Sequence, residues 1–255
     1  MAGLETSFNA FGYTFTSLWH CFGNQRNLCP LPVASDLLKI SGTNVLPINT
    51  HNLSKASGRN GLELGYAGVT YDTFAQHVDV SKYHRMLNIN LQTTAKAAVD
   101  KTLMAFDLTG ERLIKLEVLR SDNIDNSDQD GLVEAAATLR RSREELIVLP
   151  LCANDIDVAK RLIDLGCPLL RIMGSPIASR AGIGDPQMLE RICALGTPVV
   201  VDGGIGTADH ALQAIRLGAR GCLINSMLFA GDAAPTDVMR RFVSELHAQA
   251  GQASR

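Results

Sequence analysis

Two opposite charges, Lys115 and Glu117, stand two positions apart in the apolar run RLIKLEVLR. In a β-strand, side chains at positions i and i+2 point to the same face, so the amine and the carboxylate would lie together. Burial favours the neutral, nucleophilic form of a lysine, and a carboxylate can carry protons to and from reacting atoms. The alternative is an ion pair on the solvated face of an edge strand, which contributes about 0–1 kcal/mol. The position of this strand in its sheet decides between the two.

A second group of residues suited to chemistry lies in the glycine-rich turn VVVDGGIGT. A buried strand ends in Asp202, and a helix begins near Thr207. Glycines let a backbone approach an anion closely, and the N-terminus of a helix offers N–H groups with partial positive charge. The pattern predicts a phosphate site, although a turn that only packs tightly against its helix is also consistent with it. The glycines concerned are Gly203, Gly204 and Gly206.

Two more turns are expected beside this one. The next apolar run ends in Asn225 and Ser226, so two neighbouring loops can hold one phosphate. Gly174 opens a polar loop, GSPIASRAGIGDP, after the run at 168–173, and an ordinary connecting loop is the alternative reading. Arg171 lies inside that run and needs a partner that the sequence does not identify.

The elements that must position these residues alternate along the chain. Amphipathic helical patterns cover residues 93–106, 131–143, 155–166, 185–196, 207–218 and 234–250. Asp155 and Asp185 occupy expected N-cap positions, and Gly166, Gly196 and Gly218 end helices. Apolar runs typical of buried strands lie at 17–22, 44–49, 85–91, 112–119, 146–152, 168–173, 197–204 and 221–227.

Alternating strands and helices with short links predict a parallel sheet. Eight strands in 255 residues match an α/β fold of the (β/α)8 TIM-barrel type, here one domain over residues 1–255. A short hairpin is expected before it, at residues 8–16, and a long loop, with at most one short helix, at 54–79. An open doubly wound sheet is the alternative, but no GxGxxG turn follows the first strand.

This architecture answers the question of the charged pair. A strand of a barrel has no solvated face, because one side meets helices and the other the barrel interior. Lys115 and Glu117 must therefore point inward, close to the C-terminal mouth where the active sites of barrels lie.

Composition excludes several classes of protein. A formal net charge of −2 gives no reason to expect nucleic acid or an anionic membrane as a partner. No apolar run approaches about 20 residues, and the N-terminus lacks the features of a signal peptide. The six cysteines form no CxxC pair, and the six histidines lack metal-ligand spacing. We expect a cytoplasmic enzyme, a homo-oligomer, with neither a metal nor a cofactor.

Five segments, taken together, resemble the bacterial thiazole synthases of thiamin biosynthesis. In chain order they are FGYTFTS, LIKLEVL, GSPIASRAGI, VVVDGGIG and CLINS. The KLE strand combined with the DxGIG turn is specific to that family, whereas either one alone is weak. The resemblance covers most of the chain and is strongest over residues 113–248.

The resemblance implies a (β/α)8 barrel in which Lys115 forms an imine with 1-deoxy-D-xylulose 5-phosphate. It implies that Glu117 and Asp202 are the acid/base groups. Sulfur would arrive from the thiocarboxylate at the C-terminus of a small ubiquitin-like sulfur-carrier protein, and dehydroglycine would complete the ring. The positions that match the family's sugar-phosphate-binding residues are Gly174, Gly203, Gly204, Asn225 and Ser226.

The chain departs from the family pattern in its first half. CFGNQR stands in place of a GTGK-like segment, INTHNLS in place of paired basic residues, and NINLQ in place of PNTAG. These are mouth positions near the substrate, so a relative that inserts sulfur into another sugar phosphate, making a thiosugar, is an alternative. A Schiff-base aldolase or isomerase on the same barrel is a second one, and a non-catalytic binding subunit a third. The buried charges of Lys115, Glu117 and Asp202 argue against the third, since burial without a use is costly.

Overall fold

The computed structural model describes residues 7–10, 13–16, 18–20, 31–64, 69–122 and 127–253. The CFGNQR segment, residues 21–26, lies outside them. The strands are β1 (Ser7–Ala10), β2 (Tyr13–Thr16), β3 (Leu18–His20), β4 (Val45–Asn49), β5 (His84–Ile89), β6 (Leu113–Leu116), β7 (Ile147–Cys152), β8 (Leu170–Ile172), β9 (Val199–Asp202) and β10 (Gly221–Ile224). The α-helices are α1 (Leu31–Ser41), α2 (Tyr71–Ala75), α3 (Ala95–Thr109), α4 (Gln129–Ser142), α5 (Ile156–Asp164), α6 (Pro186–Cys193), α7 (Ala208–Arg216) and α8 (Pro235–Ala253). Three 3₁₀ helices complete the described elements: η1 (Gly58–Gly61), η2 (Val80–Lys82) and η3 (Ser226–Phe229).

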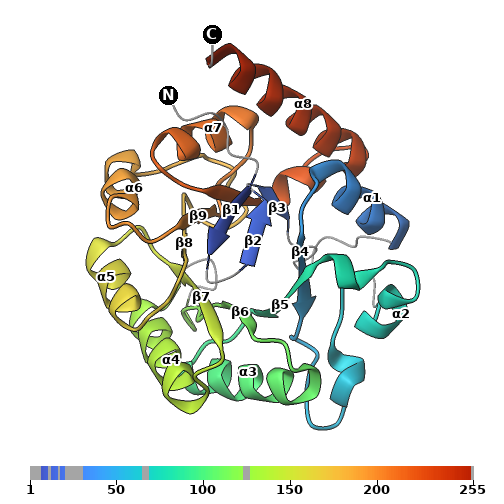
Figure 1. Cartoon of the computed structure of the whole chain (residues 1–255), viewed down its shortest axis with the longest axis vertical. Helices are drawn as coiled ribbons and strands as arrows, with labels where there is room; N and C mark the ends of the chain where they lie inside the picture. The colour runs from blue at the N-terminus through green and yellow to red at the C-terminus, as the bar shows by residue number, and fades with distance from the viewer. Residues whose placement is uncertain are drawn as a thin grey trace.

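Eight of these strands form one curled sheet, in the order β3-β10-β9-β8-β7-β6-β5-β4. Every neighbouring pair is parallel. The helices surround the sheet, and α8 packs against both α7 and α1 to complete the outer ring (Figure 1). The predicted (β/α)8 barrel is confirmed. Among the described residues, no helix combines the length and apolar character needed to cross a membrane.

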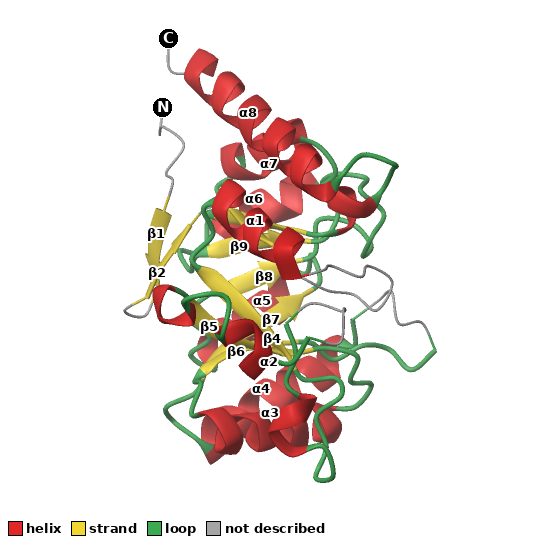
Figure 2. Cartoon of the chain, turned by 90° about the vertical axis from the view of Figure 1, so that its right-hand side faces the viewer, coloured by secondary structure: helices red, strands yellow, loops and turns green. Residues whose placement is uncertain are grey.

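The predicted hairpin is β1 and β2, which pair antiparallel. It lies in front of the ring of strands in Figure 1 and to one side of the barrel in Figure 2. Because β2 ends at Thr16 and β3 begins at Leu18, the hairpin precedes the N-terminal end of its barrel strand. It therefore covers the end of the barrel opposite the mouth.

The barrel interior has two layers that follow from the alternation of side chains along each strand. Eight apolar residues form a core cluster of their own: Val45, Met86, Leu113, Ile147, Leu149, Leu169, Val200 and Leu223. The residues two positions further along the same strands share this inward face and lie nearer the C-terminal ends. Most of them are polar: Asn88, Lys115, Arg171, Asp202 and Asn225. The apolar layer thus underlies a polar layer at the mouth.

Three differences from the sequence prediction concern the first half of the chain. Helix α1 was not predicted, although Ala34, Leu37 and Leu38 are buried at helical spacing. The segment 54–79 contains the expected short helix, α2, but it also holds η1, and Glu63 forms isolated bridges with Asn49 and Thr70. The predicted strand at 112–119 is shorter than expected, because β6 ends at Leu116.

Helix starts follow the capping residues in the sequence. The side chain of Asp155 accepts hydrogen bonds from the backbone N–H groups of Asp157 and Val158 at the start of α5, at 2.8 and 3.1 Å. Asp185 caps α6 in the same way, with Pro186 as the first helical residue. Both predicted N-caps are confirmed.

Replacement of the α5 cap should be measurable as a loss of stability. We expect Asp155→Ala to lower the free energy of unfolding by about 1 kcal/mol, because it leaves two backbone N–H groups of the first turn without their acceptor. Asp157→Ala is the matched control on the same turn. Its side chain is 85% exposed and forms a surface ion pair with Lys160 at 3.6 Å, so a loss of a few tenths of a kcal/mol is expected. Equal losses in urea unfolding would contradict the capping role.

Candidate active site

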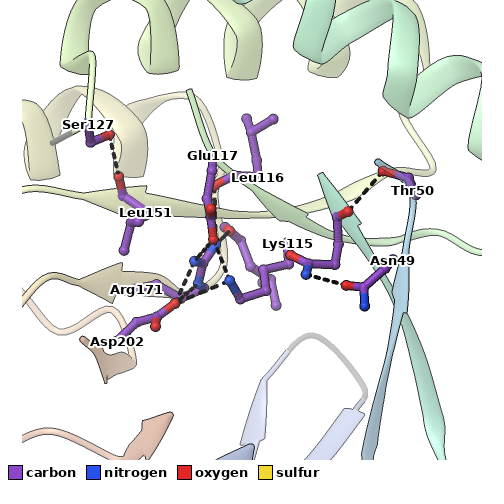
Figure 3. Close-up of polar contacts among 11 residues, drawn as sticks. Asn49, Thr50, Lys115, Leu116, Glu117, Ser127, Leu151, Arg171 and Asp202 are labelled. Atoms are coloured by element: carbon purple, nitrogen blue, oxygen red, sulfur yellow. Dashed lines mark hydrogen bonds and ion pairs between the residues drawn. The ribbon is translucent and has the colours of Figure 1, made fainter. Parts of the chain in front are cut away.

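The charged residues predicted at the mouth come together in the barrel interior. Lys115 lies on β6, Glu117 follows directly after its last residue, and Asp202 is the last residue of β9. The Lys115 amine contacts the Glu117 carboxylate closely and lies 3.5 Å from Oδ2 of Asp202. Lys115 is 5% exposed and Glu117 7% exposed. The pair is therefore not a solvated ion pair, and Figure 3 shows the three side chains converging.

Arg171 is the partner that the sequence did not supply. It lies on β8, is fully buried, and extends toward the same cluster (Figure 3). Its Nη2 contacts Oε1 of Glu117 at 2.8 Å and Oδ2 of Asp202 at 2.5 Å. The partners that the sequence could not identify are therefore Glu117, at the end of β6, and Asp202, on β9. The cluster thus brings two basic and two acidic side chains together.

The protonation of Asp202 follows from these neighbours. Burial by itself raises the pKa of this carboxyl, but the positive charges of Lys115 and Arg171 outweigh burial, so its pKa lies below the usual range. Asp202 is therefore ionised at neutral pH.

Next to the cluster lies a pair of buried amides on β4 and β5. Asn88 is the register partner of Lys115 in the β5–β6 pairing. Its Nδ2 donates to Oδ1 of Asn49 at 2.7 Å, and its backbone carbonyl accepts from Oγ1 of Thr50 at 2.9 Å. Oδ1 of Asn88 is buried and has no hydrogen-bond partner among the described residues. A buried amide oxygen that lacks a donor can accept a hydrogen bond from a hydroxyl group of a ligand.

The glycine-rich turn follows Asp202 and packs tightly against the β8–α6 loop. Gly203 and Gly204 have φ of 95° and 84°, which favour glycine. A Cβ on Gly204 would lie 2.5 Å from the carbonyl oxygen of Gly182, and one on Gly174 would lie 2.9 Å from that of Gly203. Close loop packing is thus one reason for these glycines, and the phosphate site remains a prediction beside it.

The remaining predicted phosphate residues lie around the same turns. The backbone N–H of Gly206 donates to Nδ1 of His210 at 3.2 Å. This hydrogen bond joins the turn to the first turn of α7. Asn225 follows β10, and its buried Oδ1 has no hydrogen-bond partner in the described part of the chain. Ser226 is the first residue of η3.

The cysteines of the described part of the chain are structural. Burial raises the pKa of Cys152, Cys167 and Cys222 to about 12 and that of Cys193 to about 11, so these thiols are protonated at neutral pH. Cys21 and Cys29 lie outside the described residues. Within the described ranges, no group of histidine, cysteine or acidic side chains is arranged to hold a metal ion.

Fold and site together define a (β/α)8 barrel protein with a buried lysine between carboxylates at the C-terminal mouth. A family model described as "Thiazole biosynthesis protein ThiG" matches residues 64–254. The chain belongs to this family.

Individual relatives agree with this assignment. Thiazole synthases of Brucella canis and of Geobacter sp. strain M21 are 38% and 33% identical to the chain over 158 residues. Those matches cover 61% and 62% of this chain but only 60% of each relative. The resemblance read from the KLE and DxGIG segments is therefore confirmed.

Solved structures extend the likeness to nearly the whole chain. The crystal structure of the Amycolatopsis orientalis BexX/CysO complex has a TM-score of 0.78 and 26% identity, and it covers 93% of this chain and 91% of that one. A thiamine phosphate pyrophosphorylase from Pyrococcus furiosus has a TM-score of 0.57 at 16% identity, covering 90% and 96%, and shares the fold alone.

Proposed function

We propose that the protein is an enzyme that inserts sulfur into a phosphorylated ketose held as an imine on Lys115. The observation that carries the proposal is the burial of Lys115 among Glu117, Asp202 and Arg171 at the barrel mouth of a thiazole synthase family member. By the family resemblance, the ketose is 1-deoxy-D-xylulose 5-phosphate.

The residues of the cluster suit imine chemistry. The neutral amine of Lys115 attacks the ketose carbonyl to form a C–N bond, and the carbonyl oxygen leaves as water after two proton transfers. Asp202, held ionised by its neighbours, accepts a proton from the carbon or nitrogen next to the reacting centre. Glu117, in contact with the amine, serves the proton transfers at nitrogen.

The substrate phosphate is proposed to bind at the turn that follows Asp202. Gly203 and Gly204 place the backbone directly beside the carboxylate of Asp202, and Asn225 ends the neighbouring strand β10. A phosphate there would hold the carbonyl of a short sugar within reach of Lys115 on the same inner face. The tight loop packing of Gly204 is compatible with this role, because it fixes the turn before any ligand arrives.

The sulfur is proposed to come from another protein. The described cysteines have thiols that stay protonated at neutral pH, which makes them poor sulfur carriers. The similar structure of BexX is a complex with a second protein, CysO. These observations support a ubiquitin-like carrier whose thiocarboxylate tail enters the barrel mouth.

Borohydride reduction tests the imine directly. Wild-type protein incubated with 1-deoxy-D-xylulose 5-phosphate and then reduced should carry the sugar phosphate on the peptide that contains Lys115, as seen by mass spectrometry. The same sugar without its phosphate should be trapped at least about tenfold less, because the anchoring interaction is lost. Adducts on other lysines only, or none with any phosphorylated ketose, would refute the proposal. Cleavage of a carbon–carbon bond without a sulfur donor would indicate an aldolase instead.

A second candidate is insertion of sulfur into a sugar phosphate that keeps its hydroxyl groups, giving a thiosugar. The observation that favours it is the buried amide pair of Asn49 and Asn88 beside Lys115. A 1-deoxy sugar presents a methyl group where another ketose presents a hydroxyl, and the unpartnered Oδ1 of Asn88 suits the hydroxyl. Competition between the two kinds of ketose phosphate in the same trapping experiment distinguishes them.

A further inference from the structure

We propose that Arg171 is a positioning residue that holds the two carboxylates of the cluster as its own ion-pair partners, so that they do not keep the Lys115 amine in its charged form. The inference rests on the proposed function only in taking Lys115 as the nucleophile. It assigns a task to a fully buried arginine that no sequence pattern explains.

The hydrogen bonds of Arg171 show that it does not act on substrate itself. A guanidinium group has five N–H donors in a fixed fork. Its Nη1 donates to the backbone carbonyls of Leu116 and Leu149, both at 3.1 Å. Its Nη2 donates to Glu117 and Asp202, and its Nε donates to Asp202 at 2.8 Å. Every donor thus has an acceptor within the protein, and the group is fixed by strands β6 and β7.

The same contacts make Arg171 and Lys115 share the two carboxylates as partners. Oδ2 of Asp202 lies 2.5 and 2.8 Å from nitrogens of Arg171 but 3.5 Å from the Lys115 amine. Oε1 of Glu117 contacts both Arg171 and Lys115. On the neighbouring strands, the register partners of Lys115 are Asn88 and Leu149, which carry no charge. Without Arg171, two carboxylates would face a single lysine, and their full attraction would favour its protonated form.

A purely structural role is the competing explanation, since a buried guanidinium that bonds two strand carbonyls also stabilises the barrel. The two roles differ in what they predict for Lys115. A structural role predicts lower stability and an unchanged reactivity of the amine in the protein that remains folded. The proposed role predicts that the amine becomes reactive only at higher pH, and that removal of one carboxylate reverses this change.

The experiment measures the reactivity of Lys115 without any sugar. Formaldehyde forms an imine with a neutral amine and releases water, and cyanoborohydride reduces that imine to a methylated amine. The rate of methylation of the Lys115 peptide is followed by mass spectrometry from pH 6 to 10, with Lys39, 73% exposed on α1, as the internal reference. Wild type, Arg171→Met, Arg171→Lys and the double variant Arg171→Met with Asp202→Asn are compared.

In Arg171→Met, the pH dependence of the methylation rate of Lys115 should move to higher pH by about one unit or more. Methylation at pH 7 should then be about tenfold slower than in wild type. Arg171→Lys keeps the charge and should keep the wild-type profile. The double variant restores the balance of one positive and one negative group and should return toward wild type.

An unshifted profile in Arg171→Met, or a shift in Arg171→Lys as large as in Arg171→Met, would overturn the inference. If Arg171→Met does not fold, Arg171→Gln, which is neutral but can still donate to the strand carbonyls, and its double variant with Asp202→Asn take their places and are judged by the same criteria. Absence of any sugar phosphate adduct in wild type would instead refute the proposed function, while the formaldehyde profiles would still report on Arg171.

Discussion

Lys115→Ala should abolish borohydride trapping of the sugar phosphate and lower turnover by at least about a thousandfold, because no imine can form without the amine. The fold should be retained, since Arg171 still contacts both carboxylates in the variant. Trapping is measured by mass spectrometry of the intact protein, turnover by product formation with the carrier, and folding by circular dichroism.

The matched control is Lys101, a second lysine whose pKa is lowered by burial. Lys101 donates to the backbone carbonyl of Leu53 at 2.6 Å, and burial lowers its pKa, so it is the alternative nucleophile near the mouth. Lys101→Ala should leave the adduct on Lys115 in place. Covalent trapping that survives in Lys115→Ala and disappears in Lys101→Ala would reverse the assignment.

Gly204→Ala should lower the free energy of unfolding by about 2–5 kcal/mol. Part of the loss, about 1–2 kcal/mol, comes from a side chain at a φ of 84°. The rest, about 1–3 kcal/mol, comes from overlap of the new methyl with fixed backbone atoms. It would lie 2.5 Å from the carbonyl oxygen of Gly182 and 2.8 Å from the backbone nitrogen of Ser175. Urea unfolding monitored by circular dichroism measures the change.

Gly196→Ala separates the two contributions. Gly196 also has a positive φ, 90°, but no atom lies within 4 Å of a Cβ built there, so only the conformational cost of about 1–2 kcal/mol is expected. Similar losses for the two variants would show that loop packing at Gly204 is not tight. Gly204 is also a proposed phosphate position. Borohydride trapping of the sugar phosphate should therefore fall in the Gly204→Ala protein but not in the Gly196→Ala protein.

The barrel and the inward direction of Lys115 were predictable because both follow from periodicity. Strands buried on both faces read as apolar runs, so two charges inside such a run must meet the interior. Arg171 shows the limit of this reasoning. Its presence in a buried strand was evident, but its partners are distant in sequence, at Glu117 and Asp202. Only the closure of the sheet, which places β6, β8 and β9 around one interior, brings them together.

The first half of the chain was less predictable for a different reason. Helix α1 has apolar residues at helical spacing, yet the residue before its start is Pro30, a type that offers no capping side chain. The loop 54–79 is ordered in part by pairing with a strand end, through Glu63 and Asn49, which no local signal announces. The amide pair of Asn49 and Asn88 was likewise visible only as a departure from the family pattern.

The two-layered interior has a kinetic consequence for the proposed reaction. The apolar layer from Val45 to Leu223 and the N-terminal hairpin close one end of the barrel, so both reactants must use the same entrance. A sugar bound to Lys115 would lie deeper in the barrel than the C-terminal tail of a carrier protein docked at the mouth. For the proposed reaction we therefore expect ordered binding, with the sugar phosphate first and the carrier second. A carrier docked early would act as a dead-end inhibitor, with inhibition that rises with its concentration and is relieved by more sugar.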